Sequence, residues 1–167
     1  GTTPHLTAEN LFNIVSGLDL PAIHFRGAGP AIASVVAGEP PVGAGAVATP
    51  LPFVKSGRLR AIAVSSAARV ASLPDVPTFA EAGFPGVQDD TWIGVFLPAG
   101  TPPAIVQKLN ESINQALQGA DMRERLDALA FEPVGGTPQQ FAAYVKAEIA
   151  KWGKVVREGN IKAEEFK

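Results

Sequence analysis

The chain has 167 residues, of which 46% are hydrophobic and 18% charged, with a net charge of −2. This balance predicts a globular chain, and it gives no basic surface for nucleic acid or for an anionic membrane. The absence of cysteine excludes disulfides, thiolate nucleophiles and cysteine-based zinc sites, while two histidines are too few to build a histidine metal site.

The first predicted element is a helix at the very start of the sequence. Thr3 is the predicted N-cap, Pro4 the first helical residue, and Gly17 the residue that ends the helix. In an α/β protein such a helix normally follows a strand, and no strand precedes this one. The sequence therefore reads as if it began in the middle of a domain.

Short strands and short helices alternate over the next part of the chain. Strands are predicted for the apolar runs at 21–26, 42–47, 59–64 and 92–97. Helices are predicted over 31–37 and 50–56, and Thr78 with Glu81 forms a capping box for one more helical turn. This alternation predicts an α/β fold with a mostly parallel sheet that is covered on both faces.

The remaining part is predicted to be mainly helical. Helices are expected from Pro102 to Leu117, after a capping box at Asp121 and Glu124, and after a second box at Thr137 and Gln140. Residues 132–134 are a predicted edge strand. Apolar residues recur at helical spacing on one face of the first of these helices: Ile105, Leu109, Ile113 and Leu117. In the last helix a buried stripe is predicted: Phe141, Tyr144, Val145, Ile149, Trp152 and Val156.

Motifs for catalysis are missing from the sequence. It contains no GxSxG, no Walker A lysine, no HExxH and no GxGxxG after a strand. Asp89 and Asp90 are adjacent carboxylates, but neighbouring side chains in an extended segment point to opposite sides, so they make a poor acid/base pair. Asp89 is interpreted as a capping or solvated acid. We predict a protein that is not an enzyme and uses no cofactor.

Binding of a small anion is better supported. The first turn of a helix leaves backbone N–H groups unpaired and carries a partial positive charge, which suits a carboxylate. Two predicted helix starts, Gly1–Pro4 and Gly27–Pro30, follow loops rich in threonine or glycine, and Thr49-Pro50 directly follows a strand. Each start alone is equally consistent with ordinary capping. Together, at the carboxyl ends of strands, they predict an anion-sized cleft.

Three aromatic or imidazole side chains have two interpretations each. His5 lies in the first turn of a helix, where a proton would oppose the helix dipole, so a neutral, hydrogen-bonded form is predicted. His24 is predicted to be a core histidine rather than a ligand-binding one. Trp92 either lines a ligand cleft or fills an interface between lobes.

Five segments in order carry a family resemblance: GTTPHLTAENLF, HFRGAGPAIASVVAGE, PFVKSGRLRAIAVSSAARVASLPDVPTFAEAGFPG, TWIGVFLPAGTPPAIVQKLN and FEPVGGTPQQFAAYVKAEIAKW. With them the chain resembles the periplasmic substrate-binding proteins of tripartite tricarboxylate transporters, often called Bug or TctC-like proteins. The resemblance implies a two-lobed, periplasmic-binding-protein-like (Venus flytrap) α/β fold, of which this chain is the C-terminal part. Residues 1–90 would form most of the second lobe. Residues 91–167 would form the crossover strand and the helical C-terminal part of the first lobe.

The resemblance also implies a function and partners. Such a protein captures a small carboxylated solute, a di- or tricarboxylate or related organic acid, and delivers it to the membrane components of the transporter. Family members are about twice as long, carry a signal peptide that this chain lacks, and act in the periplasm. The missing N-terminal half, or another chain, would complete the fold. The alternative is a ligand-binding sensor module that feeds a signalling receptor.

The positions that match the family's ligand-facing loops lie in four segments, where backbone amides and hydroxyls are expected to bind carboxylates. They are Thr2, Thr3 and His5; Gly27, Ala28 and Gly29; Ala48 and Thr49; and Asp90 and Thr91. The chain departs from the usual family pattern at Arg26, where lysine is common, and at Glu39-Pro40-Pro41. The expected consequence is a changed cleft floor and ligand choice, within the same fold.

Overall fold

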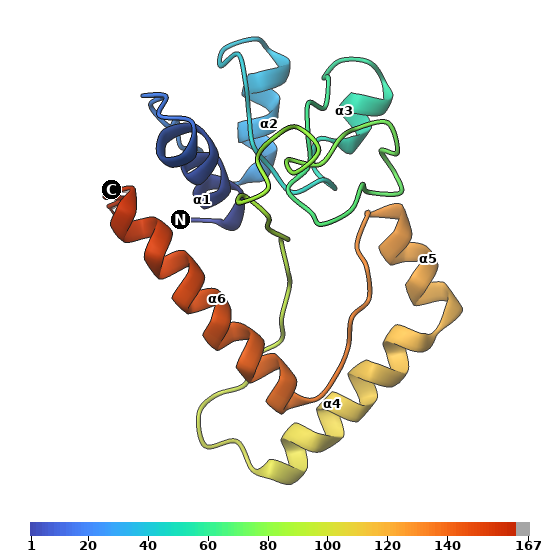
Figure 1. Ribbon diagram of the computed structural model, residues 1–167. Helices are drawn as coiled ribbons and strands as arrows, with labels where there is room; N and C mark the ends of the chain where they lie inside the picture. Colours follow the sequence, from blue (N-terminus) through green and yellow to red (C-terminus); the bar gives the residue numbers. More distant parts are fainter. Residues whose placement is uncertain (163–167) are drawn as a thin grey trace. The chain divides into compact units, whose positions relative to one another are not determined.

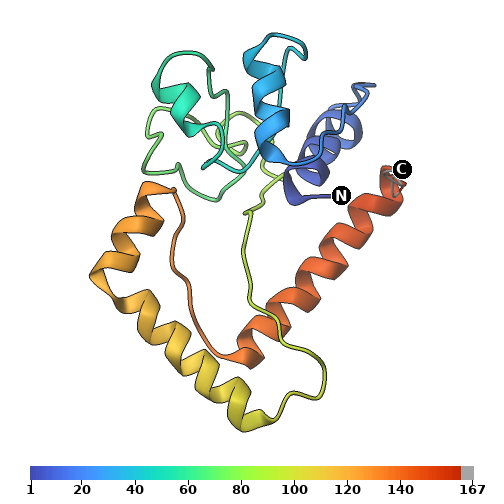
Figure 2. The same ribbon diagram turned by 180° about the vertical axis from the view of Figure 1, so that it is seen from behind.

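The structure, a computed structural model, describes residues 1–162 (Figures 1 and 2). Its regular elements are the helices α1 (Thr3–Glu9), α2 (Ala28–Val36), α3 (Leu51–Lys55), α4 (Pro103–Gln118), α5 (Ala120–Ala128) and α6 (Pro138–Glu158), with one π-helix, η1 (Asn10–Val15). Among the residues described, no helix combines the length and the apolar character that crossing a membrane requires.

The chain divides into two compact units. Unit 1 consists of Gly1–Thr91 and the segment that starts at Lys154, and unit 2 consists of Trp92–Gly153. The last residues of α6 therefore belong to unit 1. All apolar side chains found to be buried among the described residues lie in unit 1: Leu6, Leu11, Ile32, Leu51, Val64, Val87 and Val155. The assignment of residues 1–90 and 91–167 to two ligand-binding lobes stays a prediction.

Local sequence signals predicted many helix ends correctly. Gly38 and Gly57 follow α2 and α3 with φ angles of +81° and +73°, in the left-handed region where glycine avoids the strain of a Cβ atom. At the start of α6, the Thr137 N–H donates to Gln140 Oε1 at 2.8 Å and the Gln140 N–H donates to Thr137 Oγ1 at 3.2 Å. The predicted capping box is confirmed there.

Three predicted helix starts are wrong. The N-cap of α1 is Thr2 rather than Thr3, and Thr2 makes no side-chain cap hydrogen bond. Helix α2 begins at Ala28, three residues before Ala31, so Pro30 lies within its first turn, where a missing N–H costs nothing. The α5 N-cap is Gly119, without a side-chain cap bond, because Asp121 already lies inside the helix.

The predicted strands do not form a sheet in the described part of the chain. The segments 21–26, 42–47, 59–64, 92–97 and 132–134 are not assigned as strands, and one isolated parallel bridge joins Val64 to Thr78. There the Val64 N–H donates to the Pro77 carbonyl at 2.9 Å and the Phe79 N–H donates to the Val64 carbonyl at 2.8 Å. A strand requires a neighbour for its backbone groups, and these segments find almost none among residues 1–162.

The same shortage of neighbours affects the helices of unit 2. Ile105, Leu109 and Ile113 of α4 are exposed, as are Tyr144 and Ile149 of α6, the last at 69%. The prediction of a buried stripe in α6 is thus wrong for Tyr144 and Ile149. An apolar stripe shows which face of a helix suits burial, but burial needs a second element opposite that face.

Candidate functional site

All residues predicted to face a ligand belong to unit 1, in four segments. One is the start of α1, the second is the start of α2, the third is the turn before α3, and the fourth is Asp90-Thr91. In both views α1 and α2 begin at the same end of this unit (Figures 1 and 2). The helix starts that sequence analysis selected are therefore grouped on two neighbouring helices.

Within residues 1–162, no side chain caps the first turn of α1. Thr2 is exposed and extended, with φ −83° and ψ 160°, and its carbonyl accepts the first helical hydrogen bond from the Leu6 N–H at 3.0 Å. Its hydroxyl makes no bond to the helix amides. Amides in the first turn of a helix have no partner within the helix, so this end suits an anionic ligand.

His5 joins the start of α1 to the segment that precedes α2. Its Nδ1 lies 2.9 Å from the Gly1 amine and its Nε2 lies 3.5 Å from Glu9 Oε1. Its ring packs edge-on against the His24 ring, with centroids 4.5 Å apart. Burial lowers the pKa of His5, the Gly1 amine and His24 lower it further, and Glu9 opposes them. His5 is therefore neutral at neutral pH, which agrees with the predicted form.

The loop before α2 exposes its backbone. Gly27 has φ +111°, and a Cβ atom at Gly27 or Gly29 would meet nothing within 4 Å. The Gly27 N–H is used in a tight turn, donating to the Phe25 carbonyl at 2.9 Å. Gly27, Ala28 and Gly29 are all exposed. A ligand can approach the first turn of α2 closely because no side chain stands in front of these glycines.

The turn before α3 is a weaker site. The Thr49 N–H donates to the Ala46 carbonyl at 3.1 Å, so this amide is engaged within the turn itself. Helix α3 has only 5 residues, and Pro50 and Pro52 carry no N–H. If Thr49 binds a ligand, its hydroxyl is the group to do so.

The segment before the crossover contains an unpredicted contact. Asp89 is 5% exposed and its Oδ2 accepts a hydrogen bond from Thr7 Oγ1 at 2.9 Å, while Asp90 and Thr91 are exposed. The two carboxylates do face opposite ways, as adjacent residues of an extended segment should. The interpretation of Asp89 as a capping or solvated acid is wrong. The structure buries Val87 and Asp89 and exposes Gln88 and Asp90, but the sequence does not show this alternation, because residues 89 and 90 are both aspartate.

Trp92 is a packing residue of unit 2. Its ring lies edge-on to the rings of Phe141 and Tyr144, with centroids 5.7 and 5.6 Å away. Its indole N–H donates to Glu148 Oε2 at 3.3 Å, and the Trp152 N–H donates to the same oxygen at 2.9 Å. All these contacts lie within unit 2, so they test neither interpretation of Trp92, and its place in a ligand cleft or at an interface between lobes stays a prediction.

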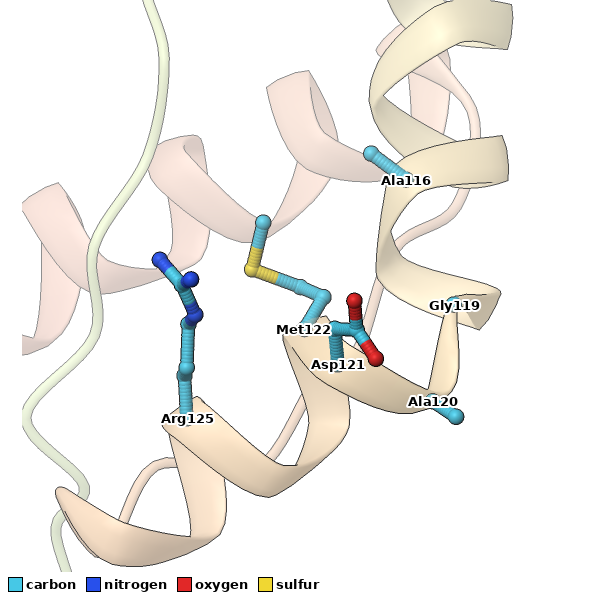
Figure 3. A pocket seen from close by; sticks show the side chains of 6 residues that line it. All are labelled: Ala116, Gly119, Ala120, Asp121, Met122 and Arg125. Carbon is cyan, nitrogen blue, oxygen red and sulfur yellow. The ribbon is translucent and has the colours of Figure 1, made fainter.

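Metal centres and cavities are two other kinds of functional site. Within residues 1–162 no group of three or more histidine or acidic side chains is arranged to hold a metal ion. A shallow cavity of about 400 Å³ lies where α4 meets α5 (Figure 3). It is lined by Ala116, Gly119, Ala120, Asp121, Met122 and Arg125. None of these residues belongs to the predicted ligand-facing set.

Comparison with known families decides the class of the chain. Residues 1–161 match the family described as "Tripartite tricarboxylate transporter family receptor". The chain belongs to this family. This membership confirms the resemblance seen in the sequence, and receptors of this family are binding proteins rather than enzymes.

Relatives of this receptor family share its sequence over nearly the whole chain. A protein from the tcbD–tcbE intergenic region of Pseudomonas sp. strain P51 is 37% identical over 98% of this chain and 48% of its own length. BugT of Bordetella pertussis is 36% identical over 97% of this chain and 49% of its own length. The chain therefore spans about half the length of these curated relatives.

Solved structures of similar receptors establish the fold. R. palustris Rpa4515, with adipate, superposes with a TM-score of 0.88 at 34% identity, over 96% of this chain and 53% of that one. MatC from Rhodopseudomonas palustris, with bound malate, gives 0.79 at 34% identity, over 92% and 53%. The periplasmic binding protein BugD gives 0.83 at 28% identity, over 97% and 55%. The chain has part of a periplasmic-binding-protein-like α/β fold.

Proposed function

We propose that the complete gene product is an extracytoplasmic solute-binding protein that captures a small carboxylate and delivers it to the membrane components of a tripartite tricarboxylate transporter. The observation that carries this proposal is the pair of similar structures holding adipate and malate, at 34% identity and TM-scores of 0.88 and 0.79. Both ligands are dicarboxylates. The family match over residues 1–161 supports the transporter as partner and the periplasm as location.

Unit 1 supplies groups that suit a carboxylate. The starts of α1 and α2 offer backbone amides, Thr2, Thr3, Thr49 and Thr91 offer hydroxyls, and the neutral imidazole of His5 adds one polar ring. None of these groups is a permanent cation. We therefore propose that helix dipoles and several hydrogen bonds, rather than one salt bridge, compensate the ligand charge.

The proposal extends to the whole fold. Residues 1–90 would be most of the second lobe, and residues 91–167 the crossover strand and helical part of the first. The relatives' additional length is the source of the remaining half of the first lobe. That half supplies neighbours for the mostly exposed segment Trp92–Leu97 and for the apolar faces of α4 and α6.

Titration calorimetry of the complete gene product tests the proposal. We expect heat of binding with malate, adipate or citrate, and none with adipamide, which keeps the length of adipate without its charges. The variant Thr2→Val should bind several times more weakly, whereas Thr101→Val in unit 2 should bind like the wild type. A folded protein that gives no heat with any of the three carboxylates would refute carboxylate capture.

A further inference from the structure

Thr7 and Asp89 connect two segments of the proposed site although they are far apart in sequence. Thr7 is on α1, one turn after Thr3, and its Oγ1 donates to Asp89 Oδ2 at 2.9 Å. Both residues are buried, at 8% and 5% exposed. Next in the chain after Asp89 come Asp90 and Thr91, which are exposed candidates for the ligand.

We propose that Thr7 and Asp89 are positioning residues, which fix Asp90 and Thr91 relative to the first turn of α1 and thereby set ligand affinity without touching the ligand. The inference rests on the proposed function, because it concerns the same site. Neither residue is among the positions that match the family's ligand-facing loops.

The backbone and the side chain of Asp89 are held by different parts of unit 1. Its N–H donates to the Ser65 carbonyl at 2.8 Å, next to the bridge between Val64 and Thr78. Its side chain is held by Thr7 from α1. Asp89 is therefore a fixed point just before Trp92, the first residue of unit 2.

The Thr7 hydroxyl has two acceptors within reach. The carbonyl of Thr3 lies 2.9 Å away, as does Asp89 Oδ2. A hydroxyl has one proton, and a carboxylate is a stronger acceptor than an amide carbonyl. The proton is therefore directed mainly to Asp89, and the bond between segments is favoured over the local bond within the helix.

Loss of this bond should raise the cost of ordering the site. A segment that is already held in its binding conformation gives up little entropy when a ligand arrives, whereas a loosened one must be ordered at that moment. We expect the variant Thr7→Val to lose about tenfold in affinity, the size of one net hydrogen bond to a charged group. Thr7→Ser keeps the hydroxyl and should stay within about twofold of the wild type.

The test uses the complete gene product with malate and adipate as probes. Thr78→Val is the matched control, because Thr78 is also a buried threonine of unit 1, at 3% exposed, and its hydroxyl accepts the Glu81 N–H at 3.1 Å. It should lower the melting temperature and leave the dissociation constant unchanged. Wild-type affinity in folded Thr7→Val, or equal losses in Thr7→Ser and Thr7→Val, would overturn the inference.

A second readout needs no ligand. Hydrogen–deuterium exchange should be faster at residues 89–91 in Thr7→Val than in the wild type, and unchanged there in Thr78→Val. If Thr7→Val does not fold, Thr7→Ala replaces it, since it also removes the hydroxyl that donates to Asp89. Faster exchange supports the inference, and unchanged exchange overturns it. If the wild type binds neither probe, carboxylate capture fails while the exchange result still decides the positioning role.

Discussion

The imidazole ring of His5 lies edge-on to the ring of His24, with 4.5 Å between the centroids and 84° between the ring planes. His5 belongs to the first turns of α1, and His24 precedes the glycine loop that leads into α2. The contact therefore ties together two of the segments proposed to bind the carboxylate. A proton on the His5 ring would therefore affect both segments at once.

Stability is expected to fall as the pH drops through the usual range of histidine. Burial is the largest cause that lowers the folded-state pKa of His5, the Gly1 amine and His24 add to it, and Glu9 opposes it. Between that lowered pKa and about 6.5 the unfolded chain therefore binds more protons. Stability due to His5 is full above the unfolded-state pKa and is lost as the pH falls toward the folded-state pKa. Melting temperatures of the complete gene product from about pH 8 to about pH 5 should show this decline, and His5→Gln should flatten it. An identical profile in His5→Gln would contradict the assignment.

Glu148 should be important for the stability of unit 2. Its Oε2 accepts hydrogen bonds from the indole N–H groups of Trp92 and Trp152, and the residue is 9% exposed. Glu148→Leu leaves both donors without this acceptor and should lower the free energy of unfolding by about 2–4 kcal/mol. Glu148→Gln keeps an acceptor oxygen and should cost less.

Urea unfolding followed by tryptophan fluorescence measures this difference. The matched control is Glu158→Gln on the same helix, because Glu158 is an exposed residue in a 3.8 Å pair with Lys154. Such exposed pairs contribute between about 0 and 1 kcal/mol. Equal effects of Glu148→Leu and Glu158→Gln would show that the two indole bonds do not stabilise the fold.

Gly94 is expected to tolerate no side chain. A Cβ atom there would collide with the Phe141 ring, whose Cε2 and Cε1 atoms would be 2.9 and 3.0 Å away. Gly94→Ala should therefore cost about 1–3 kcal/mol by overpacking, and Phe141→Leu in the same chain should recover part of it. Gly86→Ala is the control, since its Cβ would meet nothing within 4 Å and its φ is not positive. Thermal melting should give the lowest melting temperature for Gly94→Ala, a higher one when Phe141→Leu is added, and a nearly unchanged one for Gly86→Ala.

The 167 residues on their own are expected to self-associate. Large apolar side chains of unit 2 are exposed, among them Ile93 at 77%, Val134 at 90% and Ile149 at 69%. Exposed apolar patches and unpaired strand segments promote association in water. Light scattering after size exclusion should find oligomers or aggregates that bind a hydrophobic dye. A monodisperse monomer with a cooperative melt would contradict this expectation.

The helix ends that were predicted correctly have local causes. Gly38 ends α2 through its own backbone conformation, and Thr137 caps α6 through a residue three positions away. The strand at 59–64 has a correct apolar pattern, but a sheet is a relation between segments, and only Val64 finds a partner among the described residues. Apolar pattern alone does not supply that partner.

The candidate site was chosen from local signals of the same kind. The starts of α1 and α2 carry recognisable turn and cap residues, and the family motifs pointed to the same positions. Asp89 was misread because its partner, Thr7, is remote in sequence, and nothing in the residues around Asp89 indicates which helix will cover it. The ligand-facing role of Thr2, Thr3, His5, Gly27, Ala28, Gly29, Ala48, Thr49, Asp90 and Thr91 stays a prediction.

Val155, 7% exposed, is part of the core of unit 1, although the chain leaves that unit at Thr91 and rejoins it only at Lys154. A ribosome must therefore add every residue of unit 2 before unit 1 has its full set of buried side chains. During synthesis residues 1–91 therefore stay incompletely packed until the segment that starts at Lys154 has been added. We expect the two units to reach their final state together, and folding on the ribosome to depend on protection of the early segment from proteases and from other nascent chains.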